Sequence, residues 1–177
     1  MNLINDFNLL ISTYRGNEGQ LFSELEYLFE EELEVAKPII ERTGISGLLV
    51  AKISLDPLQI IEKIRKIIHE YPYKVRYALR FIPIQKVIKT SLDEVKKISL
   101  DLGKSIPEKN TFKVKVEKRF TSLHSKDFIE AAASKIDRKV DLIKPDNILL
   151  IEVLGPLTGI SLIKPNDILA VIKEKML

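Results

Sequence analysis

An eight-residue run with almost no polar interruption, NILLIEVL at residues 147–154, constrains the fold more than any other feature of this chain. A strand that faces solvent on one side alternates apolar and polar residues, whereas this run is apolar at nearly every position. It therefore predicts a strand that is covered on both faces. The rest of the chain has to supply the elements that cover it.

A basic strand is predicted just upstream, at residues 112–119 with the sequence FKVKVEKR. The side-chain period of two places Phe112, Val114 and Val116 on one face. The other face carries Lys113, Lys115, Glu117 and Arg119. Three like charges on one exposed face repel each other, and an anionic partner relieves that repulsion, as phosphates do. An ordinary amphipathic strand with a solvated face is the alternative.

The second half of the chain also contains helix signals. Ser91 followed by Glu94 is a capping box, Gly103 ends the helix that it opens, and Ser125 caps the next one, which buries Phe128 and Ile129. Further strands are expected at 139–143 and 158–163, and a terminal helix is expected after Pro165-Asn166-Asp167, with Ile168, Val171 and Ile172 inward.

The first half has a different order of elements. A strand at 7–14 precedes a helix capped by Asn17, strands at 34–42 and 47–55 form a hairpin, and a helix capped by Asp56 precedes an extended segment at 76–89. The order β-α-β-β-α-β is the ferredoxin-like pattern. We expect it to occupy residues 1–87, with no flexible linker before the second domain at 88–177.

Charge is distributed unevenly along the chain. Residues 1–86 hold 11 Lys/Arg and 12 Asp/Glu, whereas residues 87–177 hold 17 Lys/Arg and 13 Asp/Glu. The basic excess therefore lies in the second half, where it favours a polyanionic partner or else forms a lysine-rich solvated surface. The sequence has no membrane-spanning run and no signal peptide, so a cytoplasmic protein without a membrane partner is expected.

Catalytic chemistry has little support in the sequence. There is no Cys, and the two histidines, His69 and His124, lack metal-ligand spacing. The glycine-rich, nucleophile-elbow and metalloprotease motifs are also missing. We therefore expect a protein that is not an enzyme, with no cofactor and no metal. Arg15, in the turn Thr13-Tyr14-Arg15-Gly16 before a helix, is a candidate phosphate contact, although a plain strand-to-helix turn is the alternative.

Several short motifs in the second half resemble the THUMP domain, an RNA-binding module of tRNA-modifying systems. They are Lys118-Arg119, Val140-Asp141-Leu142, Pro145-Asp146, Ile151-Glu152-Val153 and Ile160-Ser161. With FNLLISTYRG at residues 7–16, nearly the whole chain resembles the stand-alone THUMP adaptor of tRNA cytidine acetylation. The resemblance implies that the protein grips the acceptor end of tRNA and presents the tRNA to a separate acetyltransferase.

The sequence thus predicts an α+β protein in which a ferredoxin-like N-terminal domain packs on a THUMP-like α/β domain. The expected function is tRNA binding as a non-catalytic adaptor for acetylcytidine formation. Two alternatives stay open: a THUMP subunit for another enzyme such as a methyltransferase, and a ferredoxin-like ligand-binding regulatory protein with no RNA role. The candidate RNA-binding residues are Arg15, Lys113, Lys115, Lys118, Arg119, Lys139 and Lys144.

Overall fold

The structure is a computed structural model that describes residues 4–177. The chain divides into two compact units. Unit 1 consists of the residues up to Ile84 together with Asn166–Leu177, and unit 2 consists of Gln85–Pro165. Residues 166–177 therefore belong to unit 1, although the sequence predicts them to be part of a second domain at 88–177.

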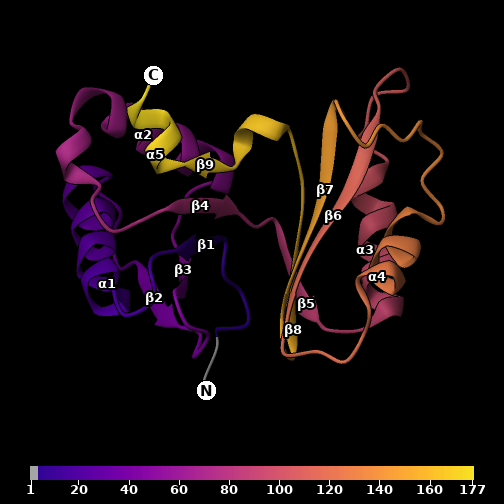
Figure 1. Ribbon diagram of the computed structural model, residues 1–177, viewed down its shortest axis with the longest axis horizontal. Coiled ribbons are helices and arrows are strands. Elements are labelled where there is room, and N and C mark those ends of the chain that lie inside the picture. Colours follow the sequence, from indigo (N-terminus) through magenta and orange to yellow (C-terminus); the bar gives the residue numbers. More distant parts are fainter. Residues whose placement is uncertain (1–3) are drawn as a thin grey trace. The chain divides into compact units, whose positions relative to one another are not determined.

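Unit 1 is built on a five-stranded sheet with the order β2-β3-β1-β4-β9, in which all neighbours are antiparallel. Its strands are β1 (Leu9–Ser12), β2 (Ile39–Arg42), β3 (Leu48–Lys52), β4 (Arg80–Pro83) and β9 (Leu169–Ala170). The predicted hairpin is confirmed as β2 and β3. The sheet packs its core against helices α1 (Glu18–Tyr27) and α2 (Pro57–Glu70), with Leu21, Ile61 and Phe81 among the fully buried side chains (Figure 1).

The ends of these helices follow local rules only in part. Asp56 caps α2 as predicted, because its carboxylate accepts hydrogen bonds from the backbone N–H groups of Leu58 and Gln59. Asn17 occupies the N-cap position of α1 as predicted, but its side chain makes no capping hydrogen bond. Beyond α1 the chain continues as one turn of π-helix at Leu28–Glu32 and, after α2, as a 3₁₀ turn at Pro72–Lys74.

The C-terminal segment completes unit 1. After a 3₁₀ turn at Pro165–Asp167 come β9 and the short helix α5 (Val171–Lys175). The buried carboxylate of Glu174 binds the Arg65 guanidinium, and its Oε2 lies 2.8 Å from Nε2 of His69, so that α5 is fastened to α2. The helix predicted to follow Asp167 therefore begins only at Val171, after the short strand β9. Ile172, predicted to point inward, is 56% exposed.

Unit 2 contains a four-stranded sheet with the order β5-β8-β7-β6. Its strands are β5 (Lys86–Lys89), β6 (Phe112–Arg119), β7 (Asn147–Leu154) and β8 (Leu157–Ile163). β6 and β7 run parallel, and the other pairs are antiparallel. Every residue of β7 is buried, which confirms the strand predicted from the apolar run.

Helices α3 (Leu92–Gly103) and α4 (Ser125–Ala133) cover one face of this sheet (Figure 1). Val95 of α3 and Phe128 of α4 pack against Leu149, Ile151 and Ile160 of the sheet. Ser91 caps α3 as predicted. Ser125 lies inside α4 rather than capping it, and the N-terminus is closed by the Asp127 carboxylate, which accepts the backbone N–H of His124.

Candidate nucleic-acid interface

Two loops of unit 2 are joined at the end of the sheet where β6 and β7 begin. The backbone N–H of Phe112 donates to the carbonyl of Lys139, and that of Asn147 donates to the carbonyl of Thr111. The Asn110 side chain donates to Oδ1 of Asn147 over 3.1 Å. Because β6 and β7 are parallel, the segments that lead into them, around residues 104–111 and 135–146, are held at the same end.

These two segments and the start of β6 carry seven Lys/Arg side chains, which we name the basic end, against four acidic residues, Glu108, Asp137, Asp141 and Asp146. The basic residues are Lys104, Lys109, Lys113, Lys135, Arg138, Lys139 and Lys144. Lys104, Lys109, Lys135, Lys139 and Lys144 are exposed, and Lys113 and Arg138 are half-buried. Residues 85–165 hold 16 Lys/Arg and 11 Asp/Glu, so that unit 2 as a whole also carries a positive excess. A positive surface of this kind suits contacts with phosphates.

The loop at residues 139–146 is held by its own acidic side chains. The Asp141 carboxylate accepts the backbone N–H groups of Ile143 (2.9 Å) and Lys144 (3.0 Å), which together lower the pKa of Asp141, the Lys144 hydrogen bond having the larger effect. The Asp146 carboxylate accepts the backbone N–H of Thr111 over 2.8 Å. Both carboxylates are thus engaged with backbone groups, which fix the backbone of the loop from which the exposed Lys139 and Lys144 side chains extend. The strand predicted at 139–143 is reduced to a single bridge between Val140 and Phe112.

A small basic pocket of about 240 Å³ lies beside this loop, where α3 ends and the chain leaves α4. Lys104, Lys135 and Arg138 line it, and Nε of Arg138 donates to the carbonyl of Ile106 over 2.9 Å. Gly103 allows the close approach here, because a Cβ at that position would lie 2.8 Å from Cγ1 of Ile136 and the Ile136 side chain would have to shift. The close approach brings the basic side chains that follow the two helices next to one another.

The residues predicted from the sequence do not all lie at this end. Lys113, Lys139 and Lys144 do, and Lys115 follows two residues after Lys113 on the same strand face. Lys118 and Arg119 lie at the opposite end of β6, and by the period of two Lys118 is on the other face from Lys113. Arg15 belongs to unit 1.

Arg119 forms an ion pair with a buried carboxylate, which the strand pattern of the sequence does not indicate. Its Nη1 lies 2.7 Å from Oε2 of Glu152, whose side chain is 2% exposed, while the Arg119 side chain is 25% exposed. The expectation of a solvated face shared by Lys113, Lys115 and Arg119 is therefore wrong for Arg119. A guanidinium engaged with a buried carboxylate supports the fold of unit 2.

We expect Arg119→Ala to lower the free energy of unfolding of unit 2 by about 2 kcal/mol, because it removes a charge-assisted hydrogen bond to a buried carboxylate. Urea titration followed by circular dichroism measures the change. Lys118→Ala is the matched control on the neighbouring residue, which is exposed, and it should change the stability by less than about 0.5 kcal/mol. Equal effects of the two substitutions would contradict the assignment of a structural role to Arg119.

Four residues of the basic end are not among the RNA-binding candidates predicted from the sequence: Lys104, Lys109, Lys135 and Arg138. They lie just after helices or in a turn, where isolated lysines are common and carry no periodic signal. Only the parallel pairing of β6 with β7 brings these residues together. A sequence signal for them would have required that pairing to be known first.

Arg15 lies in a separate setting in unit 1. It is exposed and precedes α1, but the nearby Glu18 carboxylate already accepts the backbone N–H of Gly47 over 2.7 Å, a contact that lowers the pKa of Glu18. The N-terminal region of α1 therefore already contains a carboxylate, which disfavours a phosphate beside Arg15.

Among residues 4–177, no group of three His, Cys, Asp or Glu side chains is arranged to hold a metal ion. None of the helices in this part of the chain has the length and apolar character needed to cross a bilayer.

No protein-family profile matches the sequence, and no curated protein sequence matches it either. Solved structures are similar over most of the chain. PH1313 from Pyrococcus horikoshii OT3 is similar with a TM-score of 0.64 at 19% identity, over 89% of this chain and 55% of that one. TrmN from Thermus thermophilus has a TM-score of 0.58 at 15% identity, with coverages of 87% and 44%.

A third similar structure is a complex of a 4-thiouridine synthetase with RNA and bound ATP. Its TM-score is 0.51 at 19% identity, over 90% of this chain and 42% of that chain. At these identities the similarity establishes a shared α/β fold. The chain spans about half, or less, of the length of these three proteins.

Proposed function

We propose that this protein binds tRNA through the basic end of unit 2 and that it is a THUMP-type protein of tRNA modification. The observation that carries the proposal is the assembly of seven Lys/Arg side chains, from two separate loop segments and the start of β6, at one end of the β6–β7 pair. Cations around a rigid loop suit contacts with the phosphate backbone, and duplex RNA is recognised mainly through its backbone and shape.

The structural comparisons support this proposal. The 4-thiouridine synthetase structure contains RNA and shares its fold with 90% of this chain. Unit 1 also fits the expected accompanying domain. Its order β-α-β-β-α-β, with β2-β3-β1-β4 as antiparallel neighbours, favours a ferredoxin-like arrangement to which β9 adds a further strand.

The finer part of the proposal is that the protein is a non-catalytic adaptor. In this role it holds the acceptor end of tRNA and presents the tRNA to a separate cytidine acetyltransferase. The resemblance of motifs such as Val140-Asp141-Leu142 and Pro145-Asp146 to the stand-alone THUMP adaptor supports this role. In the structure these motifs lie in the loop at residues 139–146, where Lys139 and Lys144 are exposed.

The adaptor role is tested by reconstitution. We expect no acetylcytidine when the protein is incubated with unmodified tRNA and acetyl-CoA, and stimulated formation when a candidate acetyltransferase is added. Nucleoside analysis by mass spectrometry measures the product. Acetylation by this protein alone, or no stimulation of the acetyltransferase, would contradict the adaptor role. Methylated nucleosides formed only with a co-purified methyltransferase would assign the protein to that enzyme instead.

A further inference from the structure

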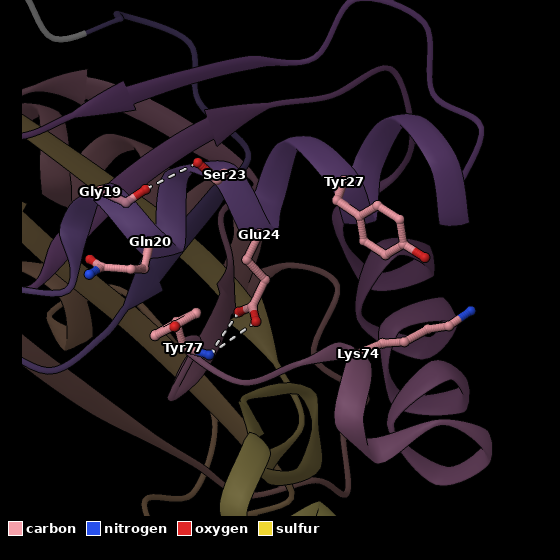
Figure 2. A pocket seen from close by; sticks show the side chains of 7 residues that line it. All are labelled: Gly19, Gln20, Ser23, Glu24, Tyr27, Lys74 and Tyr77. Atoms are coloured by element: carbon pink, nitrogen blue, oxygen red, sulfur yellow. Dashed lines mark hydrogen bonds between the residues drawn. The ribbon is translucent and has the colours of Figure 1, made fainter.

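Unit 1 contains an open groove of about 620 Å³ that the proposed RNA contacts leave unused. One wall is a face of α1, and the other is the segment that leads from the 3₁₀ turn toward β4 (Figure 2). We name it the α1 groove. Its lining residues are Gly19, Gln20, Ser23, Glu24, Tyr27, Lys74 and Tyr77.

The two walls of the α1 groove are fastened together by one side chain. The Glu24 carboxylate accepts the backbone N–H groups of Tyr77 (3.0 Å) and Ala78 (2.8 Å), and it also binds the backbone N–H of Arg76. Figure 2 shows this carboxylate crossing from α1 to the backbone of Tyr77. These hydrogen bonds hold the two walls of the groove at a fixed spacing, which lowers the entropic cost of binding.

Tyr27 is held in one orientation at the end of the groove. Its hydroxyl donates to Oε1 of Glu32 over 2.7 Å, and Nζ of Lys74 donates to the same oxygen over 2.5 Å. Tyr27 and Glu32 are five residues apart, and the π-helical turn between them places both on one side of the chain. The Lys74 and Tyr27 hydrogen bonds lower the pKa of Glu32, in keeping with a stable carboxylate. Tyr27 remains 43% exposed and offers an aromatic surface to a partner.

The segment that carries the α1 wall of the groove is rich in glutamate, although the Arg42 guanidinium lies beside Gly19 at one end of it. Residues 17–36 contain seven Glu and no Lys or Arg. Glu26, Glu30, Glu31 and Glu34 are exposed. On the opposite wall Lys74 is engaged with Glu32, and the Arg76 guanidinium lies 5.9 Å from the Tyr77 ring centroid. A polyanion such as RNA is repelled from this surface, whereas a cation is attracted to it.

We propose that the α1 groove binds a Lys- or Arg-bearing segment of a protein partner, with one cationic side chain over the Tyr27 ring. Cations bind tyrosine faces when the charge lies within about 6 Å of the ring centroid. This chain already contains one such contact nearby, in which Nζ of Lys74 lies 4.4 Å from the Tyr71 centroid. The surrounding glutamates attract the basic segment and make the encounter specific for positive charge.

The identity of the partner rests on the proposed adaptor function, in which it is the catalytic protein that receives the tRNA. The two units then carry opposite charges for different ligands. Unit 2 binds RNA with its basic end, and the α1 groove of unit 1 binds the enzyme. Negative charge beside the groove keeps the RNA from competing for the protein site.

The test uses the full chain and a defined probe, an acetylated and amidated peptide of six arginines spaced by glycines. In ¹⁵N–¹H NMR titrations we expect the peptide to shift the amides of residues 19–27 and 74–77. Tyr27→Ala should weaken peptide binding by roughly tenfold. Tyr27→Phe should retain most of the affinity, because the ring remains. Tyr73→Ala is the control, since Tyr73 is 68% exposed and does not line the groove.

Two results would overturn the proposal. One is a set of peptide-induced shifts that spreads over all acidic surfaces and is unchanged by Tyr27→Ala. The other is binding of a five-nucleotide oligouridine in the α1 groove, which would make it an RNA site. Titration of tRNA into the same variants separates this proposal from the function above. Tyr27→Ala should bind the peptide roughly tenfold more weakly and keep its affinity for tRNA. A parent protein that binds the peptide but not tRNA would refute the proposed function alone.

Discussion

Simultaneous replacement of Lys109, Lys139 and Lys144 by Glu is expected to reduce the affinity for tRNA by at least about a hundredfold near 0.1 M salt. These three exposed lysines come from both segments of the basic end. Each substitution replaces a phosphate contact with a repulsion, and the three changes act on one surface. Folding should be largely retained, because exposed charges contribute only about 0–1 kcal/mol each. Fluorescence-anisotropy titrations with labelled tRNA, together with thermal melts, measure both effects.

The matched control is Lys89, Lys118 and Lys126 changed to Glu. These lysines are also exposed in unit 2 but lie where β5 and β6 end and α4 begins, and their replacement changes the net charge equally. We expect a loss of less than about tenfold from the general field. A larger loss in the control than in the first variant would place the RNA at the opposite end of the sheet.

The salt dependence gives a second readout of the same change. In the parent, log K should fall steeply with log salt concentration, since each neutralised phosphate releases counterions. Removal of three phosphate contacts should decrease the slope by about three. Titrations at four salt concentrations measure the slope. Duplex DNA bound as tightly as tRNA would indicate attraction by charge without recognition of RNA shape.

Phe128→Ala is expected to lower the free energy of unfolding of unit 2 by about 3–5 kcal/mol. The ring is fully buried between α4 and the sheet, among Val95, Leu149 and Ile151, so that its removal leaves a cavity. Urea titration gives the loss. Hydrogen exchange read by mass spectrometry should locate it in residues 85–165, while exchange in unit 1 remains close to that of the parent.

Ile129→Ala is the control for this substitution. Ile129 follows Phe128 on the same helix but is 41% exposed, which corrects the expectation that α4 buries both residues. Its replacement should cost less than about 1 kcal/mol. At temperatures where Phe128→Ala is still folded, its affinity for tRNA should match that of the parent. Equal stability losses in the two variants would contradict the packing described for α4.

The sequence predicted the elements of the fold better than their assembly. The alternation in β6 and the apolar run of β7 are local patterns, and the caps at Asp56 and Ser91 depend only on nearby backbone groups. The strand predicted at 139–143 was wrong because the Asp141 carboxylate bonds the backbone N–H groups that an extended ladder would need. Apolar residues suggested a strand there, but side-chain to backbone hydrogen bonds decided the structure.

The candidate interface was predictable only in part, for a related reason. Lys139 and Lys144 flank a recognisable motif, whereas Lys109 and Arg138 join them through the parallel pairing of distant strands. The ion pair between Arg119 and Glu152 also joins two different strands, so the sequence around either residue does not predict it. A strand pattern shows that two charges share a face or an end, but it does not show which of them is engaged with a buried partner.

The return of the chain into unit 1 also determines how the molecule transmits mechanical load. Asp6 and Lys173 both belong to unit 1, although nearly the whole chain lies between them. Tension applied at these two positions passes first through the contacts of β9 and α5, including the Glu174 carboxylate held by Arg65 and His69. Unit 2 lies outside the load path until those contacts break. Residues 166–177 therefore have to detach from unit 1 before force reaches unit 2. In an optical trap, detachment of β9 and α5 should come before any extension of unit 2, whichever unit is the more stable at equilibrium.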